Sequence, residues 1–423
     1  MRHPAYPRGL DRDDLIAWYR AGRARSAQVF GIPRDEAYYE RPIALRNPIV
    51  FYEGHLPAFA VNTLPKLVLG RGGIDERYEV LFARGIDPED EAAAKSPTDL
   101  WPRRDEIIEY GRTADDLIAR TLCDGDIDRD DRQAAIAILE HEQMHQETLL
   151  YMFHELAYAR KNPQPPFAAS PEPFRTPAGV PTKDQVSIPA GLTTLGGRPG
   201  DFGWDNEFPS IQVAVDAFSI DRHNVTNGDY RVYMKETGAP APHFWALHDG
   251  AWNWRGMFGL VPLPLESPVY VTHEEATAYA ASKGRRLPTE AEYHRAAYGT
   301  PEGEERLHPW GDEVPDHTRG NFGFTHWDPV PVGSYPAGAS AWGVHDLVGN
   351  GWEWTSTVFD GFPGFEPMAC YPVYSADFFD GKHYVMKGAS PATAPELVRS
   401  GFRNWFRSNY PYVYATFRCV SGD

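Results

Sequence analysis

Cysteine is scarce in this sequence, and long hydrophobic runs are missing. Only Cys123, Cys370 and Cys419 occur among 423 residues. So small and odd a count argues against a disulfide scaffold and favours a reducing compartment. No run of 18 apolar residues is present, and the segment from Met1 to Asp14 lacks the apolar core of a secretory signal. These absences predict a cytoplasmic protein with no membrane partner.

An excess of basic residues is also missing. The formal net charge is −18, and the densest basic cluster is the pair Arg285 and Arg286. A field this negative repels DNA and RNA unless a basic stripe overrides it. We therefore expect no nucleic-acid partner.

Proline, in contrast, is concentrated at one place. Seven of the 25 residues between 161 and 185 are prolines, and such a stretch can neither continue a helix nor sit in a central strand. The length of the chain fits two domains better than one. The sequence therefore predicts a domain at 1–160, a linker at 161–185 and a second domain at 186–423.

The two halves differ in pattern. Helical periodicity before the linker predicts an antiparallel four-helix bundle, with its helices at 11–29, 46–66, 98–123 and 129–160. After the linker, short β-rich runs alternate with turn residues and a few helices. The clearest are Ile211–Val215, Phe218–Ile220, Asn227–Thr237 and His273–Lys283. We expect a helical bundle followed by an irregular α/β domain.

The last predicted helix carries two histidines four residues apart, His141 and His145. This spacing places both imidazoles on one helix face, where they can bind one cation. Two hydrogen-bonded or solvent-facing histidines are the simpler interpretation. The letters also match His-Glu-x-x-His, the zinc-peptidase motif in which Glu142 would be the general base. No downstream ligand of the extended peptidase motif follows, however, and position 151 is Tyr.

A third ligand is available upstream. His55 lies in the second predicted helix, within the mostly apolar segment Phe51–Phe59. A buried histidine with satisfied hydrogen bonds remains the alternative for this position.

Ordered motifs carry a resemblance to a known family. One His in the second helix and His-x3-His-x-Glu in the fourth resemble a DinB-like bundle. The second half resembles the formylglycine-generating-enzyme (sulfatase-modifying-factor) domain, which has a C-type-lectin-like fold. The motifs are Gly284–Tyr293, His308–Asp312, Val332–Pro336, Asp346–Asn350, Trp352–Thr355 and Phe417–Cys419. Their combination is similar to the ergothioneine sulfoxide synthases.

This resemblance implies a chemistry. His55, His141 and His145 match the three histidines that bind Fe(II) in that family. Three imidazoles leave open positions on iron for a thiolate or selenolate, the substrate imidazole and O2. The implied enzyme is a non-haem iron oxidoreductase that forms a carbon–chalcogen bond on hercynine, the N-trimethyl betaine of histidine.

The resemblance also assigns substrate contacts. Asn404 and Trp405 match the hercynine-binding Asn-Trp pair, in which an indole face can hold a quaternary ammonium. A tyrosine near iron delivers a proton and an electron. We favour Tyr371 for this role and keep Tyr374 as the alternative. Met144 stands where the branch that uses γ-glutamylcysteine has a substrate-binding Gln.

The chalcogen donor is predicted from positions at which this chain differs from the branch that uses γ-glutamylcysteine. That branch has Asp where this chain has Phe406, and it has arginines where this chain reads Ala92–Lys95. Aromatic residues such as Phe406, Tyr410 and Tyr412 could stack on a sugar. We therefore expect a selenoneine synthase with a selenosugar donor. The alternative is an ergothioneine sulfoxide synthase that uses cysteine or γ-glutamylcysteine.

Three rival functions remain. Copper–thiol oxidation of the formylglycine type needs two close cysteines near the C-terminus, and Cys419 has no such neighbour. A zinc metallopeptidase lacks its downstream ligand. A non-catalytic carbohydrate-binding module leaves the three histidines unexplained.

Overall fold

The computed structural model describes residues 2–6, 9–83, 101–130, 132–167 and 184–422, which form two compact units. Within these ranges, the first unit contains residues 2–3, 9–165 and 369–371, and the second contains 4–6, 166–368 and 372–422. Most of the predicted linker, 168–183, lies outside the described residues. Two stretches depart from the predicted division, because residues 4–6 group with the second unit and residues 369–371 group with the helices.

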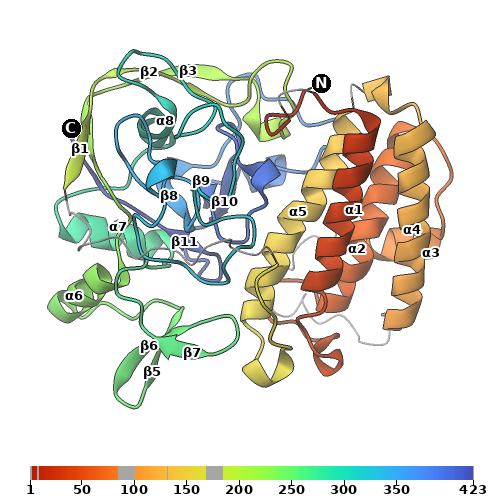
Figure 1. Ribbon diagram of the computed structural model, residues 1–423, viewed down its shortest axis with the longest axis horizontal. Coiled ribbons are helices and arrows are strands. Elements are labelled where there is room, and N and C mark those ends of the chain that lie inside the picture. Colours follow the sequence, from red (N-terminus) through yellow and green to blue (C-terminus); the bar gives the residue numbers. More distant parts are fainter. Residues whose placement is uncertain (1, 7–8, 84–100, 131, 168–183, 423) are drawn as a thin grey trace. The chain divides into compact units, whose positions relative to one another are not determined.

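The first unit is built from helices, which occupy the red-to-yellow part of Figure 1. In α1, the buried residues Leu15, Trp18, Tyr19, Ser26 and Val29 follow spacings of three, four and seven positions, as a helix packed on one face requires. Helix α1 packs on α4 and α5, and α2 packs on α4 and α5. The helices are α1 (Arg12–Val29), α2 (Ile49–Val61), the π-helix η2 (Asn62–Val68), α3 (Glu76–Leu81), α4 (Arg104–Asp124) and α5 (Gln133–His154).

The observed helix ends have local causes. Asp11 caps α1 by accepting a hydrogen bond from the backbone N–H of Asp14. Helix α2 passes into a π-helix at Asn62, and Pro65 lies within that π-helix. Proline has no N–H for the regular helical ladder, so the change of register has a physical reason.

Helix α5 is shorter than the predicted 129–160. Arg132, directly before it, adopts a left-handed conformation with φ 67°, so the acidic residues upstream form a separate 3-10 turn, η4 (Ile127–Asp130). After α5, the ammonium of Lys161 donates to the carbonyl of His154 at 3.1 Å. Helix α4 begins at Arg104, whereas the predicted start at 98 lies outside the described residues.

The second unit is a set of small sheets with three short helices and long loops (Figure 1). Its sheets run in the orders β1-β4-β12, β10-β9-β8-β11, β2-β3 and β5-β6-β7. The helices are α6 (Asn227–Thr237), α7 (His273–Ser282) and α8 (Glu290–Tyr298). The strands are β1 (Gln185–Ile188), β2 (Gly191–Leu195), β3 (Ile211–Val215), β4 (Phe218–Asp221), β5 (Trp245–His248), β6 (Ala251–Arg255), β7 (Leu260–Pro262), β8 (Gly351–Val358), β9 (His383–Ala389), β10 (Asn404–Arg407), β11 (Ala415–Thr416) and β12 (Val420–Ser421).

The four-stranded sheet presents the predicted substrate segment. Strand β10 pairs antiparallel with β9, so that Asn404 lies opposite Met386 and Trp405 opposite Val385. Trp352 and Trp354 of β8, the strand on the other side of β9, are buried in the core. Sequence order alone could not reveal that β10 forms the edge of this sheet.

Candidate metal centre

Helices α2 and α5 bring three imidazoles together. The potential ligand atoms of His55, His141 and His145 all lie within 4.8 Å of one another. His141 and His145 are one turn apart on α5, which puts them on one face, and α2 packs against α5 to bring His55 to that face. Within the described ranges, no other group of three His, Cys, Asp or Glu side chains is arranged to hold a metal ion.

The spacing and protonation of these rings fit a divalent cation. The Nε2 atoms of His141 and His145 are 3.1 Å apart. Two nitrogens bound at ~2.1 Å on adjacent positions of an octahedral ion lie ~3.0 Å apart. Burial lowers the pKa of His55 to about 4, and burial together with the neighbouring imidazoles holds the pKa of His141 well below its usual range. Neutral imidazoles keep a lone pair for a metal.

Hydrogen bonding fixes the orientation of one ring. Nδ1 of His55 donates to the backbone carbonyl of Phe82 at 2.8 Å, which leaves Nε2 as the ligand atom. Nδ1 of His145, in contrast, is buried and has no partner in the described part of the chain. His145 is the most exposed of the three residues and marks the accessible side of the cluster.

Aromatic side chains of α2 line the cluster. Phe51 stacks on His55 with ring centroids 5.0 Å apart, and Phe59 stacks on His141 at 3.5 Å. The ring of Tyr52 lies 5.7 Å from that of His145. This apolar lining excludes water from the imidazoles and limits their motion.

The carboxylate of the peptidase-like motif points elsewhere. Glu142 accepts hydrogen bonds from the guanidinium of Arg23 at 2.9 Å and from the hydroxyl of Ser26, both on α1. The side chain of Gln146 also faces α1, where its amide donates to the carbonyl of Gly22. Gln146 therefore points away from the histidine face of α5, and Met144 is half-buried on the same helix.

The two candidate tyrosines lie in different environments. Tyr371 belongs to the helical unit, where its ring is 5.0 Å from Phe59 and 6.2 Å from His141 between ring centroids. Tyr374 belongs to the second unit, where it stacks on Trp204 at 4.2 Å and meets Trp405 edge-on at 5.3 Å. Only Tyr371 is thus beside the histidine cluster within one unit.

The predicted substrate residues form a group in the second unit. Trp405 stacks on Phe359 with ring centroids 4.2 Å apart, so one indole face is already covered. The side-chain oxygen of Asn404 accepts a hydrogen bond from the N–H of Trp405. Phe406 stacks on Tyr410 at 5.0 Å, and Tyr410 meets Tyr412 edge-on.

Buried charges support this strand, and the sequence did not reveal them. Arg403 forms two hydrogen bonds, at 3.0 and 3.1 Å, with the carboxylate of Glu290. The ammonium of Lys387 donates to the carbonyls of Ser400 and Phe402, in the loop that leads into β10. Burial lowers the pKa of Lys387 to about 8. The arginines just before β10 were the only feature of the sequence that could have indicated these buried ion pairs.

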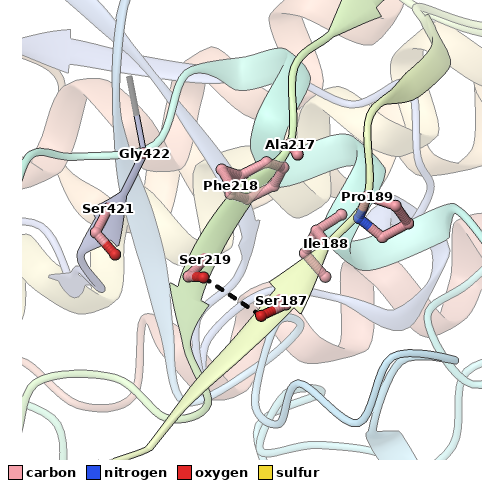
Figure 2. A pocket seen from close by; sticks show the side chains of 8 residues that line it. All are labelled: Ser187, Ile188, Pro189, Ala217, Phe218, Ser219, Ser421 and Gly422. Carbon is pink, nitrogen blue, oxygen red and sulfur yellow. Dashed lines mark hydrogen bonds between the residues drawn. The ribbon is translucent and has the colours of Figure 1, made fainter.

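The thiol of Cys419, in the second unit, is buried and poorly ionised. Cys419 is 1% exposed and has no disulfide partner, and burial raises the pKa of its thiol. A shallow depression of about 480 Å³ lies on the surface near β1, β4 and β12 (Figure 2). Its lining includes Ser187, Phe218 and Ser219 but none of the predicted site residues.

Comparison with known proteins places the chain in a family. The sulfatase-modifying factor enzyme 1-like domain matches residues 170–422. The chain belongs to this family. No helix in the described segments is both long and apolar enough to cross a membrane.

Members of the family match the chain to different extents. Ergothioneine biosynthesis protein 1 of Neurospora crassa is 31% identical over 92% of this chain and 55% of its own length. Hercynine oxygenase of Mycolicibacterium smegmatis is 36% identical over 63% of this chain and 67% of its own length. The formylglycine-generating enzyme of Bos taurus is 30% identical over 44% of this chain and 61% of its own length.

These relatives confirm the resemblance to ergothioneine sulfoxide synthases at the level of the family, and the prediction of an enzyme. The match to the formylglycine-generating enzyme covers less than half of this chain, whereas the first match also extends over the helical unit. The chain spans about half the length of the ergothioneine biosynthesis protein.

Proposed function

We propose that the chain is an Fe(II)- and O2-dependent enzyme that joins the sulfur of a small thiol to the imidazole of hercynine. The observation that carries this proposal is the convergence of three neutral imidazoles beside Tyr371. The relatives named for hercynine oxygenation and ergothioneine biosynthesis support the substrate.

The net reaction balances with one O2. The imidazole C–H and the thiol S–H are lost, and a C–S bond forms. One oxygen atom goes to the sulfur as a sulfoxide and the other leaves as water. A ferrous ion bound to His55, His141 and His145 supplies the activation of O2 and the acidification of the thiol.

The residues around the cluster have separate tasks. The aromatic lining from α2 keeps water from the imidazoles and strengthens electrostatic interactions there. Tyr371 holds a phenolic proton beside His141 and is the proposed proton donor for the reaction.

The second unit would bind the betaine. The half-buried indole of Trp405 is the proposed partner of the trimethylammonium group, an attraction worth about 1–2 kcal/mol. The amide of Asn404 is the proposed partner for a polar group of hercynine. Phe359 stacks on the indole of Trp405, and the guanidinium of Arg403, which directly precedes β10, lies over the ring of Phe359.

Sulfur is favoured over selenium as the transferred atom. The named relatives support the ergothioneine alternative more than the selenoneine prediction. Phe406 and Tyr410 also cover one face of each other, which reduces the aromatic surface available to a sugar. A selenosugar donor remains the second candidate, because no carboxylate stands at position 406 to bind a peptide donor.

One experiment separates the donors. The protein is loaded with Fe(II) without oxygen and given hercynine with cysteine, γ-glutamylcysteine or a selenosugar. O2 is then admitted, and the products are identified by mass spectrometry. We expect a hercynine sulfoxide adduct with a thiol. An adduct with the selenosugar alone would favour the second candidate, and no adduct with any donor would contradict both.

A further inference from the structure

The orientation of His55 depends on a single backbone carbonyl. Nδ1 of His55 is 2.8 Å from the oxygen of Phe82, the residue that directly follows α3. Because the proton of the neutral ring stays on Nδ1 to donate this hydrogen bond, Nε2 keeps its lone pair and points into the cluster. Any shift of Phe82 therefore turns or releases the imidazole.

The ring of Phe82 is seated against a glycine of α2. A Cβ atom at Gly54 would lie 2.5 Å from two carbons of the Phe82 ring, closer than atoms can approach. The ring has no room to retreat, since it is fully buried and packs against Phe51, Trp101 and Tyr78. Only glycine at 54 permits this seating.

Conformational freedom is not the reason for this glycine. Gly54 lies inside α2, between Ile49 and Val61, and has an ordinary helical backbone. In the interior of a helix, glycine lowers the stability of the helix by about 1 kcal/mol relative to alanine. The close approach of Phe82 is what offsets that cost.

Helix α3 is also held to the π-helix η2, which follows α2. The buried carboxylate of Glu79 accepts from the ammonium of Lys66 at 2.7 Å and from the N–H of Ile74 at 2.6 Å. Its own backbone carbonyl accepts from the side-chain amide of Asn62. Burial by itself would raise the pKa of Glu79, but these hydrogen bonds lower it, so the carboxylate stays charged.

We propose that Gly54 and Phe82 form a positioning device that sets His55 for metal binding, and that Glu79 locks α3 in the place this device needs. The inference rests on the proposed metal site but assigns a role to residues outside it. Neither Gly54 nor Glu79 touches the imidazole, so both act through Phe82.

The test compares two glycines that both lie inside helices. Gly54→Ala introduces the clash with Phe82, whereas an alanine Cβ at Gly111 of α4 would meet its nearest atom, Nη2 of Arg23, at an ordinary 3.6 Å. Affinity of the metal-free, full-length protein for Fe(II) and Co(II) is measured by titration. The tautomer of His55 is followed by ¹⁵N-resolved NMR of histidine-labelled protein.

We expect Gly54→Ala to weaken metal binding at least tenfold, the range typical for loss of a group that orients a ligand. It should also abolish the single Nδ1–H tautomer of His55. Gly111→Ala should leave both unchanged. The double variant with Phe82→Leu, which lacks the two ring atoms nearest to the new methyl group, should regain part of the affinity.

A second variant covers the case in which Gly54→Ala does not fold. Glu79→Gln keeps the shape of the side chain but removes its charge, and we expect weaker metal binding with the protein still folded. Wild-type affinity and an unchanged His55 signal in the folded variants would overturn the inference. Equal losses for Gly54→Ala and Gly111→Ala would do so too. If the unchanged protein bound no metal, the proposed function would fail, while the tautomer measurement would still test the device.

Discussion

Nη1 of Arg23 donates a hydrogen bond to Oε1 of Glu142 at 2.9 Å, on the side of α5 that faces α1. His141 and His145 leave the same helix toward α2. The motif His-Glu-x-x-His therefore splits between two faces of α5 here. A carboxylate already bound by Arg23 and Ser26 is not available to activate water at the imidazoles.

The first prediction concerns Glu142→Gln. Replacing the carboxylate leaves the largely buried Arg23 with Asp115 as its charged partner, so the free energy of unfolding should fall by about 2 kcal/mol, the range of a charge-assisted hydrogen bond. Metal content should stay the same. Urea unfolding and metal analysis measure these two effects.

Asp115→Asn provides the matched control, because Asp115 contacts the same guanidinium but is more exposed. Its loss should cost less than about 1 kcal/mol. A Glu142→Gln protein that keeps its stability and metal but loses all turnover would revive the role of a general base.

The sequence predicted those parts of the site whose geometry follows from the period of a helix. Histidines four residues apart on a helix must share a face, so the pair at 141 and 145 could be predicted from their spacing. The face taken by Glu142 could not, since it depends on Arg23, 119 positions away. A motif alone does not say which of its side chains share a site.

The second prediction separates the two tyrosines. Tyr371→Phe removes the phenolic proton beside His141 and should lower kcat at least tenfold, with KM for hercynine nearly unchanged. Tyr374→Phe keeps the ring that stacks on Trp204 and should change kcat less than threefold. Steady-state kinetics with both variants, each checked for metal content, measures the difference. The opposite order would assign the proton to Tyr374.

Spacing could not distinguish these tyrosines before the structure was known. They are three residues apart in one loop, yet residues 369–371 group with the helices and Tyr374 groups with the second unit. The same limit applies to Phe82, whose role is carried by a backbone carbonyl that no side-chain pattern reports. Contacts between residues far apart in the sequence determine where the two tyrosines and the carbonyl of Phe82 lie.

The third prediction concerns acid stability through His273, on α7. Burial lowers the pKa of its imidazole to about 4, although a hydrogen bond to the carbonyl of Thr355 opposes the shift. The unfolded chain binds a proton near pH 6.5, but the folded protein binds it only near pH 4. The stabilisation is therefore complete above pH 6.5 and is lost as the pH falls toward 4.

His273→Gln can keep the hydrogen bond but cannot titrate. Between pH 7 and 4, the unchanged protein should lose up to about 3 kcal/mol more stability than this variant. Urea unfolding followed by tryptophan fluorescence reports this difference, since all tryptophans except Trp18 and Trp101 lie in the second unit. Parallel pH profiles of the two proteins would contradict the prediction.

The last prediction tests the betaine contact at Trp405. Phe359 covers one face of the indole, so a trimethylammonium group can use only the other face. Trp405→Leu should raise KM for hercynine about five- to thirtyfold, the equivalent of about 1–2 kcal/mol of cation–π attraction. An analogue with a tert-butyl group in place of the trimethylammonium has the same shape without the charge. Its binding should weaken much less in the variant, because only packing is lost, and an equal loss for both compounds would show that Trp405 acts through packing alone.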